Sequence, residues 1–492
     1  MGRDRLTVTT LNSAACERPK YDPAQVAPGI VHLGVGAFHR AHQAVYIDDC
    51  LATGEMGWGI VGASLRSPDT RDALAPQDGL YTLAIQDASG ERLRVIGSLR
   101  QIFVAPENPA ALVARMADPS TRIVTLTVTE KAYLRNAAGE LDLSNPDVAS
   151  DIADLSNPRT VHGFIVSALA ARRRSGTSPF TVLCCDNLPA NGETVRRLVL
   201  QFAQAADPDL ARFIEQEVAF PSTMVDRIVP ATTDEDRARI SAAIGLEDAW
   251  PVKTEPFMQW VVEDHFTLGR PEWERTGVTM VKDVRPFEEM KLRLLNGAHS
   301  GLSYLGLLCG RQSVSAAFTD PAIRGFVDRL WAEAIPTLPQ GAGLDPQAYT
   351  AALSERFSNP ALVHRTAQIA NDGSQKLPQR ILATASARLA DGGSVSNLML
   401  AVAAWIACCE ARGSSLPAGH FTDPLDSDLE AIFASGPSAA ETVRKVFTRA
   451  GFDAVTGEAG KRLAEMAAGH LETIRRSGPY PAIDMASQGV SE

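Results

Sequence analysis

The stretch Gly29-Ile-Val-His-Leu-Gly34-Val-Gly36-Ala-Phe-His-Arg40 decides the fold predicted for this chain of 492 residues. An apolar strand ends in one glycine, a second glycine follows, and a helix is expected over Arg40–Thr53. Gly34 permits a tight turn, and Gly36 lets a pyrophosphate approach backbone N–H groups at the start of the helix. Position 39 is His, so the third glycine of the usual GxGxxG pattern is missing. Because the turn directly follows the first strand, it still predicts a dinucleotide-binding site.

Strand-like and helix-like segments alternate through the first half of the chain. Further apolar strands are expected at Trp58–Ser64, Arg122–Thr129 and Phe180–Asp186. This alternation predicts a mainly parallel sheet covered by helices on both faces. Helical periodicity dominates after about residue 285. The sequence therefore predicts an α/β fold with a Rossmann-like, NAD-binding domain at 1–285 and a mainly α-helical substrate and catalytic domain at 286–492.

The composition excludes several functional classes. A net charge of −11 at pH 7 argues against a nucleic-acid-binding protein, which usually has a basic face. The seven cysteines show no CxxC spacing, which argues against a zinc ribbon or a disulfide framework. The N-terminus lacks the apolar core of a signal peptide, and the longest apolar run, Leu398–Cys409, is too short to span a bilayer. We expect a cytoplasmic protein that binds neither membrane nor nucleic acid, with Leu398–Cys409 as a buried helix.

Two further features concern the cofactor and metals. A dinucleotide-binding fold usually offers an acid near the end of its second strand for the adenosine ribose. Asp69 is the candidate here, whereas Arg66 is placed to accept a 2′-phosphate instead. We expect NAD, with NADP as the open alternative. His39 and His42 form an HxxH pair without a third ligand, so we expect no metal.

A second informative stretch is EEMKLRLLNGAHSGLSYLG, residues 288–306. At about 100° per residue, Glu288, Lys291 and His299 share one helical stripe, and Asn296 flanks it. Lysine can take the proton of an alcohol, an amide can hold the developing oxyanion, and an imidazole can orient the substrate. The same residues also fit a surface lysine, a capping asparagine and a core histidine, so this helix alone does not decide the function.

Seven blocks, in order along the chain, resemble the polyol-specific long-chain dehydrogenase/reductase family. The blocks are GVGAFHRAHQ at 34–43, QDGLYTL at 77–83, TVTEKAYL at 127–134, CDNLPANG at 185–192, FPSTMVDRIVPATTDED at 220–236, EPFMQWVVEDHF at 255–266 and the helix that contains Lys291. They span most of the chain, and the ordered set is far more specific than any single block.

The resemblance implies metal-independent hydride transfer between a nicotinamide cofactor and an alcohol or ketone carbon. It implies that Lys291 is the general base in alcohol oxidation and the general acid in ketone reduction. Asn187 and Asn296 would hold the oxyanion. His299 would orient the substrate, and Asp226 would lie on the substrate side.

Two glutamates complete the site that the resemblance implies. Glu288 would relay protons between the lysine and solvent, and Glu130 would lie near the nicotinamide pocket. Free lysine titrates near ~10.4, so a lysine base at neutral pH needs desolvation or a neighbouring cation to lower its pKa. The expected cofactor-binding residues are Gly34, Gly36, Phe38, Arg40, Asp69 and Glu130.

The segment NPALVHRTAQIANDGSQKLPQR, residues 359–380, concerns the substrate. It resembles the branch of the family that acts on D-mannonate. The mannitol dehydrogenases instead carry an arginine where this chain has Gln368. We expect His364, Arg365 and Lys376 to contact the substrate. A sugar acid needs a cation for its carboxylate, which arginine can bind bidentately, whereas neutral mannitol does not.

The resemblance thus implies NAD-dependent interconversion of D-mannonate and D-fructuronate by a monomer. Within the family, the alternative is a mannitol or other polyol 2-dehydrogenase that acts on D-fructose or a related ketose. An alternative of another class is a non-catalytic NAD(H)-binding sensor. Lys291, the two asparagines and His299 argue against the sensor, which needs neither a base nor an oxyanion hole.

Overall fold

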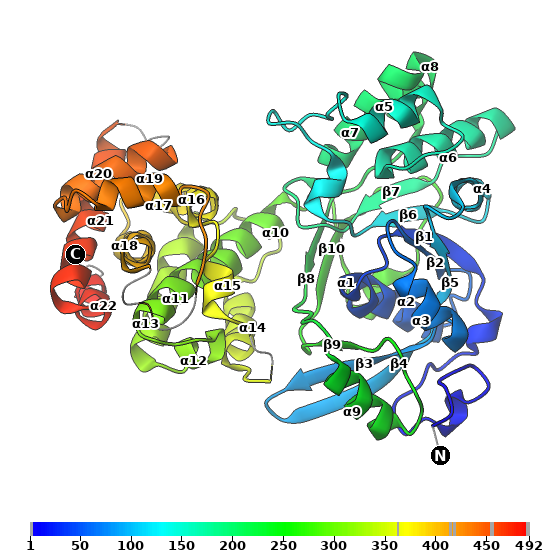
Figure 1. Ribbon diagram of the computed structural model, residues 1–492, viewed down its shortest axis with the longest axis horizontal. Coiled ribbons are helices and arrows are strands. Elements are labelled where there is room, and N and C mark those ends of the chain that lie inside the picture. The colour runs from blue at the N-terminus through cyan, green and yellow to red at the C-terminus, as the bar shows by residue number, and fades with distance from the viewer. Residues whose placement is uncertain (1–2, 362–363, 413–415, 417–419, 453–456, 489–492) are drawn as a thin grey trace. The chain divides into compact units, whose positions relative to one another are not determined.

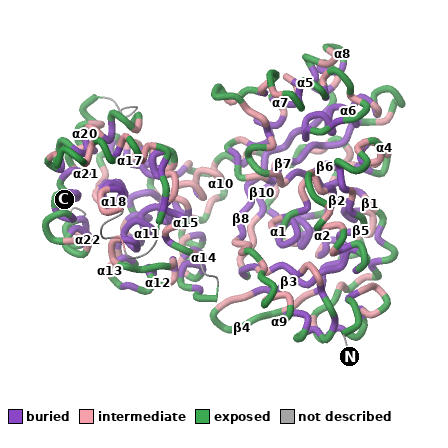
Figure 2. Tube along the Cα trace, viewed as in Figure 1, coloured by how far each residue is buried: buried purple, intermediate pink, exposed green. Residues whose placement is uncertain are grey.

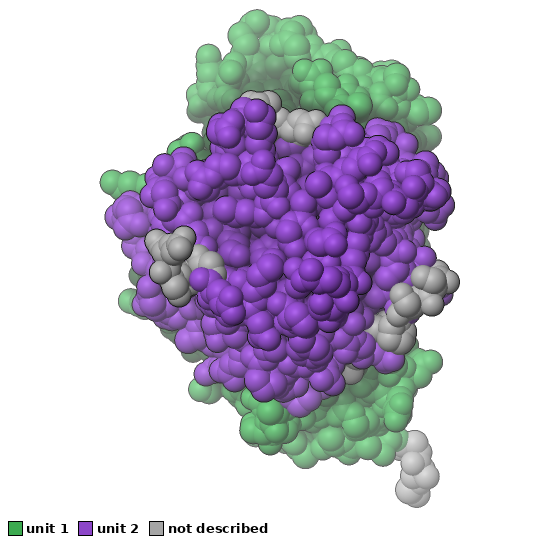
Figure 3. Space-filling model, turned by 90° about the vertical axis from the view of Figure 1, so that its left-hand side faces the viewer, with its two compact units in different colours: residues 1–285 green, residues 286–492 purple. Residues whose placement is uncertain are grey.

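The computed structural model describes residues 3–361, 364–412, 416, 420–452 and 457–488. The chain divides into two compact units, residues 1–285 and 286–492 (Figure 3). Within the described residues, every strand lies in the first unit and the second unit is helical (Figure 1). The predicted combination of a parallel α/β sheet and a helix-rich C-terminal part is confirmed.

A five-stranded sheet, in which all neighbouring strands are parallel, forms the centre of the first unit. Its strands in spatial order are β5 (Leu99–Val104), β2 (Gly59–Ser64), β1 (Pro28–Leu33), β6 (Ile123–Leu126) and β7 (Thr181–Cys184). After β1, the chain adds β2 and then β5 on one side of β1. It then adds β6 and β7 on the other side of β1. Such a reversal of strand order opens a crevice beyond the carboxyl ends of the two central strands, where ligands bind in folds of this kind.

Side chains of β1 alternate between two apolar cores, as the pleat of a strand requires. Val31 and Leu33 belong to one core, together with Phe164. Ile30 belongs to the other, together with Trp260. The helices of this unit are α1 (Ala37–Ala41), α2 (Gln43–Ala52), α3 (Asp69–Leu74), α4 (Pro109–Ala117), α5 (Pro146–Ala153), α6 (Val161–Ser175), α7 (Asn191–Ala206), α8 (Pro208–Glu217) and α9 (Asp234–Ile244).

Two smaller sheets complete the first unit. One has the order β4-β3-β9, and the other has the order β11-β10-β8. Their strands are β3 (Tyr81–Asp87), β4 (Gly90–Ile96), β8 (Thr223–Asp226), β9 (Val252–Thr254), β10 (Gln259–Glu263) and β11 (Thr279–Val281). The last residue of β8 is Asp226, which pairs with Gln259 of β10. The small sheet therefore fixes the backbone of a predicted substrate-side residue.

In the second unit, α18 (Ser396–Ala411) packs against α11 (Gly297–Leu308) and α21 (Gly457–Ser477). Both α11 and α18 are buried along nearly their whole length (Figure 2). The buried helix predicted over Leu398–Cys409 is α18. Within the described part of the chain, no helix is both long and apolar enough to cross a membrane. The other helices are α10 (Arg285–Met290), α12 (Val314–Phe318), α13 (Pro321–Ala334), α14 (Pro346–Ser358), α15 (Thr366–Ala370), α16 (Gly373–Leu377), α17 (Ala383–Ala390), α19 (Asp426–Phe433), α20 (Ala439–Ala450) and α22 (Pro479–Gln488).

The segment around Lys291 is not one uniform α-helix. A π-helical stretch, η6 (Lys291–Asn296), separates α10 from α11, and a second, η8 (Pro378–Leu382), packs against it. Hydrogen bonds in a π-helix run from i to i+5 and widen the turn. The assumption of 100° per residue is therefore wrong across η6, and the predicted single stripe does not hold there. Short π-helical segments occur frequently at functional sites.

Candidate active site

The glycine turn after β1 has the geometry that a phosphate-binding turn needs. Gly34 has φ of +95°, and a Cβ there would lie 2.1 Å from the carbonyl oxygen of Thr127. Both observations require glycine, since side chains rarely adopt this conformation and none would fit. A Cβ built on Gly36 would meet only the carbonyl oxygen of Gly34, at 3.9 Å. The space over Gly36 is thus open to a ligand.

A crevice of about 500 Å³ lies at this turn. Gly34 and Gly36 line it together with Ser64, which ends β2, the residues that follow Ser64, and the segment after β6, which includes Thr127. It therefore occupies the strand-order reversal between β1 and β6, where a dinucleotide is expected. Thr160 and Val161 at the start of α6 also line the crevice.

Among the predicted cofactor residues after β2, the structure separates Asp69 from the crevice. Arg66 and Ser67 line the crevice, whereas Asp69 is not among its lining residues. Asp69 is exposed in the first turn of α3 and accepts a hydrogen bond from the Ser67 hydroxyl at 2.9 Å. Its contact with the adenosine ribose stays a prediction.

The prediction that Arg40 contributes charge to the crevice is wrong, because Arg40 does not line it. Its guanidinium is buried, donates to the carbonyl oxygen of Trp250 at 2.5 Å, and lies 5.3 Å from the centre of the Tyr81 ring. Arg40 therefore ties α1 to the rest of the first unit instead of adding charge to the crevice. Phe38 likewise stacks on His42, at 5.0 Å between ring centres, and does not line the crevice.

The sequence pattern did not predict the role of His32, which lies beneath the turn. His32 Nε2 donates to the carbonyl oxygen of Gly34 at 3.1 Å and contacts the Thr127 hydroxyl at 2.8 Å, and Nδ1 accepts from the Thr125 hydroxyl at 2.7 Å. Burial lowers the pKa of His32 to about 3, so the ring is neutral at pH 7. The only available signal was a polar residue inside an apolar strand that leads into a glycine turn.

The HxxH pair does not form a metal site in the structure. His39 stacks on His32, with 3.3 Å between ring centres, while His42 Nε2 donates to the carbonyl oxygen of Gln259 at 2.8 Å. The two imidazoles serve different contacts. Among the residues that the structure describes, no group of three or more His, Cys, Asp and Glu side chains is placed to hold a metal ion.

The carboxylate of Asp186, next to Asn187, connects the ends of β6 and β7 through hydrogen bonds. Asp186 accepts hydrogen bonds from the Val128 backbone N–H at 3.0 Å and from the Tyr133 hydroxyl at 2.5 Å. Burial raises the pKa of the Asp186 carboxyl to about 6, and the hydrogen bonds oppose that rise. This network positions the backbone of Asn187, an exposed residue just past the end of β7, near the carboxyl edge of the sheet.

Glu130 lies beside the crevice rather than in it. It lines an adjoining hollow of about 560 Å³, which shares Lys131 and Leu134 with the crevice. Its carboxylate is exposed and pairs with Arg135 at 2.7 Å. Contact with the nicotinamide stays a prediction.

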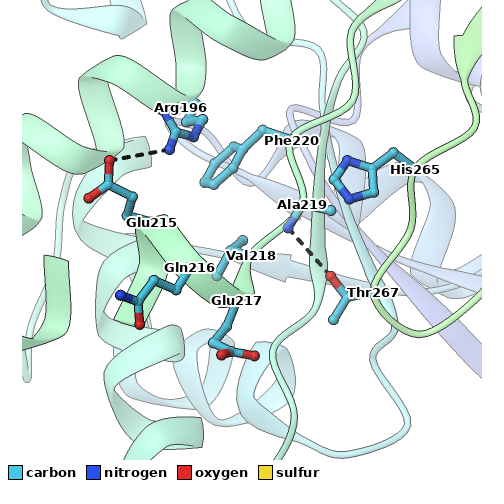
Figure 4. A pocket seen from close by; sticks show the side chains of 9 residues that line it. All are labelled: Arg196, Glu215, Gln216, Glu217, Val218, Ala219, Phe220, His265 and Thr267. Carbon is cyan, nitrogen blue, oxygen red and sulfur yellow. Dashed lines mark hydrogen bonds and ion pairs between the residues drawn. The ribbon is translucent and has the colours of Figure 1, made fainter. Parts of the chain in front are cut away.

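A second hollow of about 500 Å³ in the first unit involves none of the predicted site residues (Figure 4). It is lined by Arg196 of α7, by the end of α8 and by the loop after β10, including His265 and Thr267. Arg196 pairs there with Glu215 at 3.5 Å. The hollow therefore does not belong to the candidate active site.

In the second unit, η6 and α11 carry three of the predicted catalytic residues. Lys291 begins η6, Asn296 ends it, and His299 lies in the first turn of α11. Lys291 and Asn296 are partly buried, and His299 is buried. Glu288 is partly buried in α10, three residues before Lys291. Glu288 and Lys291, the two residues of the predicted proton relay, thus lie close together along the chain.

The structure brings His364 to His299. Their ring centres lie 5.3 Å apart at an interplanar angle of 87°, and the His299 ring also lies 4.8 Å from that of Phe357. Burial, and then the charge of Arg356, lower the pKa of His364. The two imidazoles therefore pack against each other, with Nε2 of His299 and Nδ1 of His364 buried.

The two predicted carboxylate-binding cations are less well placed. Arg365 is exposed and shows neither an ion pair nor a side-chain hydrogen bond to any described residue. Lys376 donates to the carbonyl oxygen of Asn371 at 2.6 Å and lies 3.6 Å from the Asp372 carboxylate. The charge of Lys376 is thus partly compensated within the unit.

The strand order, glycine turn and crevice of the first unit define a dinucleotide-binding Rossmann-type protein with an additional helical unit. The comparison with family models is more specific. Residues 28–275 match the mannitol dehydrogenase Rossmann domain, and residues 283–474 match the mannitol dehydrogenase C-terminal domain. The chain belongs to the mannitol dehydrogenase family, which confirms the resemblance drawn from the seven blocks.

Relatives cover nearly the whole chain. D-mannonate oxidoreductase of Escherichia coli (strain K12) is 45% identical over 423 residues, which is 85% of this chain and 87% of that protein. The crystal structure of a D-sorbitol dehydrogenase in substrate-free form has a TM-score of 0.91 at 34% identity and covers 97% of this chain and 100% of that one. Mannitol 2-dehydrogenase of Pseudomonas fluorescens, in a ternary complex with NAD and D-mannitol, has a TM-score of 0.81 at 36% identity and covers 98% and 99%.

Proposed function

We propose that this protein is an NAD-dependent oxidoreductase that interconverts D-mannonate and D-fructuronate. The observation that carries the proposal is its 45% identity, over both units, to the D-mannonate oxidoreductase of Escherichia coli. Lysine, asparagine and histidine at positions 291, 296 and 299 supply a base, an oxyanion donor and an orienting group on one segment. A sensor would need none of them.

The first unit fits the cofactor. The open space over Gly36 and the crevice at the strand-order reversal suit a dinucleotide pyrophosphate that lies on the turn of Gly34 and Gly36. The Pseudomonas fluorescens relative was solved with NAD, which supports NAD as the cofactor of this chain. When bound, NAD accepts a hydride from the substrate, and NADH returns one.

The residues of this chain handle the proton and the oxygen. In the oxidation of D-mannonate, Lys291 takes the proton of the C5 hydroxyl while the hydride leaves C5, and the product is the ketone. Asn187 and Asn296 donate amide hydrogens to the oxygen as its negative charge develops. His299 and Asp226 orient the sugar hydroxyls, and Glu288 passes the proton to solvent. Reduction of D-fructuronate runs the same steps in reverse.

The segment that contains His364, Arg365 and Lys376 would bind the rest of the sugar acid. His364 lies against His299, which favours contact with hydroxyl groups next to the reacting carbon. Arg365 and Lys376 are cations on the same segment, so each is a candidate for contact with the carboxylate.

The second candidate function is that of a polyol 2-dehydrogenase. The structural likeness to a D-sorbitol dehydrogenase and a mannitol 2-dehydrogenase favours it, since both proteins are named for neutral polyols. Neutral polyols would use the same lysine, asparagines and histidine and would need no carboxylate-binding cation.

The experiment that separates these functions follows NADH formation with D-mannonate and D-mannitol in parallel and identifies the product by ¹³C NMR. We expect turnover of D-mannonate to a product with a ketone at C5. Oxidation of D-mannitol without oxidation of D-mannonate would establish the polyol dehydrogenase instead. NAD binding without turnover of either compound would favour a non-catalytic NAD(H)-binding sensor.

A further inference from the structure

Arg380 of the second unit carries a charge that no described acid neutralises. It lies in η8, and its Nη1 donates to the Ser300 hydroxyl of α11 at 3.4 Å. Among the residues that the structure describes, this is its one side-chain hydrogen bond, and it has no ion pair there. Burial lowers the pKa of the guanidinium, which the Tyr304 hydroxyl nearby opposes. A partly buried, uncompensated cation is costly unless a ligand compensates it.

The backbone holds Arg380 beside the predicted catalytic segment. A Cβ at Gly297 would lie 3.1 Å from the carbonyl oxygen of Arg380, so the glycine permits η8 to pass close to α11. The two π-helical segments η6 and η8 also contact each other. Ser300 accepts the hydrogen bond from Arg380 and donates its own to the carbonyl oxygen of Asn296 at 3.1 Å. Arg380 is therefore two hydrogen bonds from a predicted oxyanion residue.

The neighbouring cations do not share this position. Lys376 is partly buried one turn before Arg380, and burial and the charge of Arg380 both lower its pKa. Lys376 has its own partners in Asn371 and Asp372, as described above. Arg365 is exposed to solvent, where a carboxylate contact is weakened by water. Of Arg365, Lys376 and Arg380, Arg380 is thus the one that is partly buried and also has guanidinium N–H groups without a described hydrogen-bond partner.

We propose that Arg380 binds the carboxylate of the sugar-acid substrate, with Lys376 as a second cation. The inference rests on the proposed function. Ser300 lies four residues after Asn296, about 6 Å along a helix axis. This matches the length of a six-carbon sugar acid between its carboxylate and C5. A carboxylate at Arg380 would therefore be one substrate length from an oxygen held at Asn296, and guanidinium can bind it through two parallel hydrogen bonds.

The test compares Arg380→Gln with Arg365→Gln, and Arg462→Gln at an exposed arginine of α21 is the matched control. We expect Arg380→Gln to raise the KM for D-fructuronate by about 10- to 100-fold, because a charge-assisted hydrogen bond is lost, while kcat changes less than threefold. Turnover of D-fructose, which lacks a carboxylate, should lose less than threefold in kcat/KM. Arg380→Lys should recover part of the KM, and the control Arg462→Gln should leave the KM within twofold of wild type. Melting temperature and NADH affinity confirm that each variant is folded.

Two results would overturn the assignment while the proposed function stands. A fall in kcat at unchanged KM, equal for both ketoses, would mean that Arg380 positions Asn296 through Ser300. A rise in KM in Arg365→Gln alone would show that Arg365, and not Arg380, binds the carboxylate. A wild-type protein that does not reduce D-fructuronate at all would instead refute the proposed function and this site with it.

Discussion

Lys291 stands at the junction of an α-helix and a π-helix, where the backbone departs from regular helical geometry. Its partners in the proposed chemistry are Asn296 at the other end of the π-helix and His299 one turn later. The residue types could be predicted from the sequence because a lysine, an amide and an imidazole occur together within one short block. Their mutual placement could not, since the π-helix breaks the periodicity on which the prediction relied.

We predict that Lys291→Met lowers kcat by about 10²- to 10⁴-fold, because the variant loses the general acid–base but keeps most of the length of the side chain. The NADH dissociation constant, measured by fluorescence titration, should change less than twofold. Lys461→Met, at an exposed lysine of the same unit, is the control and should retain wild-type activity. Loss of NADH binding in Lys291→Met would contradict the assignment of Lys291 to proton transfer.

Asp186 gives a pH-dependent prediction. The folded protein holds the pKa of this carboxyl at about 6, above the ordinary value of 3.8. As pH rises from 4 to 6, the unfolded chain loses this proton before the folded protein does, so the group's contribution to stability falls. Asp186→Asn cannot ionise. The free energy of unfolding of the variant should therefore rise relative to wild type by up to about 3 kcal/mol between pH 4 and pH 7.

Urea denaturation at several pH values measures this difference. A constant difference across the range would show that the pKa of Asp186 is not raised. A difference that moved the opposite way would show that hydrogen bonds from Val128 and Tyr133 outweigh burial and lower the pKa.

At the scale of elements, the glycine turn is the feature that the sequence specified most fully. Continuous apolar runs predicted β1, β2, β6 and β7, because strands covered on both faces need apolar residues at every position. The single helix expected over Arg40–Thr53 is instead α1 and α2, broken at His42, where φ is −128° and ψ is −90°. This break follows from burial of His42 and Arg40 in tertiary contacts, which no local sequence pattern predicts.

The small sheets show the same limit. β9 and β11 have three residues each, and β3 pairs with β9 across about 170 residues of chain. Such pairings depend on contacts between distant segments, so local alternation does not predict them. The interaction of η6 with η8 is likewise a tertiary contact. The part of the site built on β1 and β6 was therefore predictable, and the part that depends on η8 was not.

We predict that Gly34→Ala weakens NADH binding at least tenfold and lowers the free energy of unfolding. The variant must place a Cβ at positive φ and 2.1 Å from the Thr127 carbonyl oxygen. Gly54→Ala is a matched control, because Gly54 has φ of +103° but open space around a built Cβ. It should cost only the backbone strain of about 1–2 kcal/mol. Equal NADH affinities in the two variants would contradict the role of the turn.

For the molecule as a whole, the chain passes from one compact unit to the other near residue 285, where the hydrophobic pattern changes from alternating strands and helices to helices alone. The predicted cofactor residues lie in the first unit. The predicted base and most of the predicted substrate residues lie in the second. Ordered blocks lie in both units, so family membership could be predicted from the sequence. Substrate choice could not, because in our proposal it depends on a few side chains such as Arg365, Lys376 and Arg380.

The ratio of kcat/KM for D-fructuronate to kcat/KM for D-fructose, with NADH as the reductant and the chain of 492 residues, decides whether the substrate is a sugar acid or a neutral sugar. A carboxylate held by a charge-assisted hydrogen bond is worth about a factor of 10 to 100, so we predict a ratio of at least 10. D-tagaturonate in the same assay tests the stereochemistry of the sugar acid. A ratio below one would contradict the account and identify the protein as a polyol dehydrogenase.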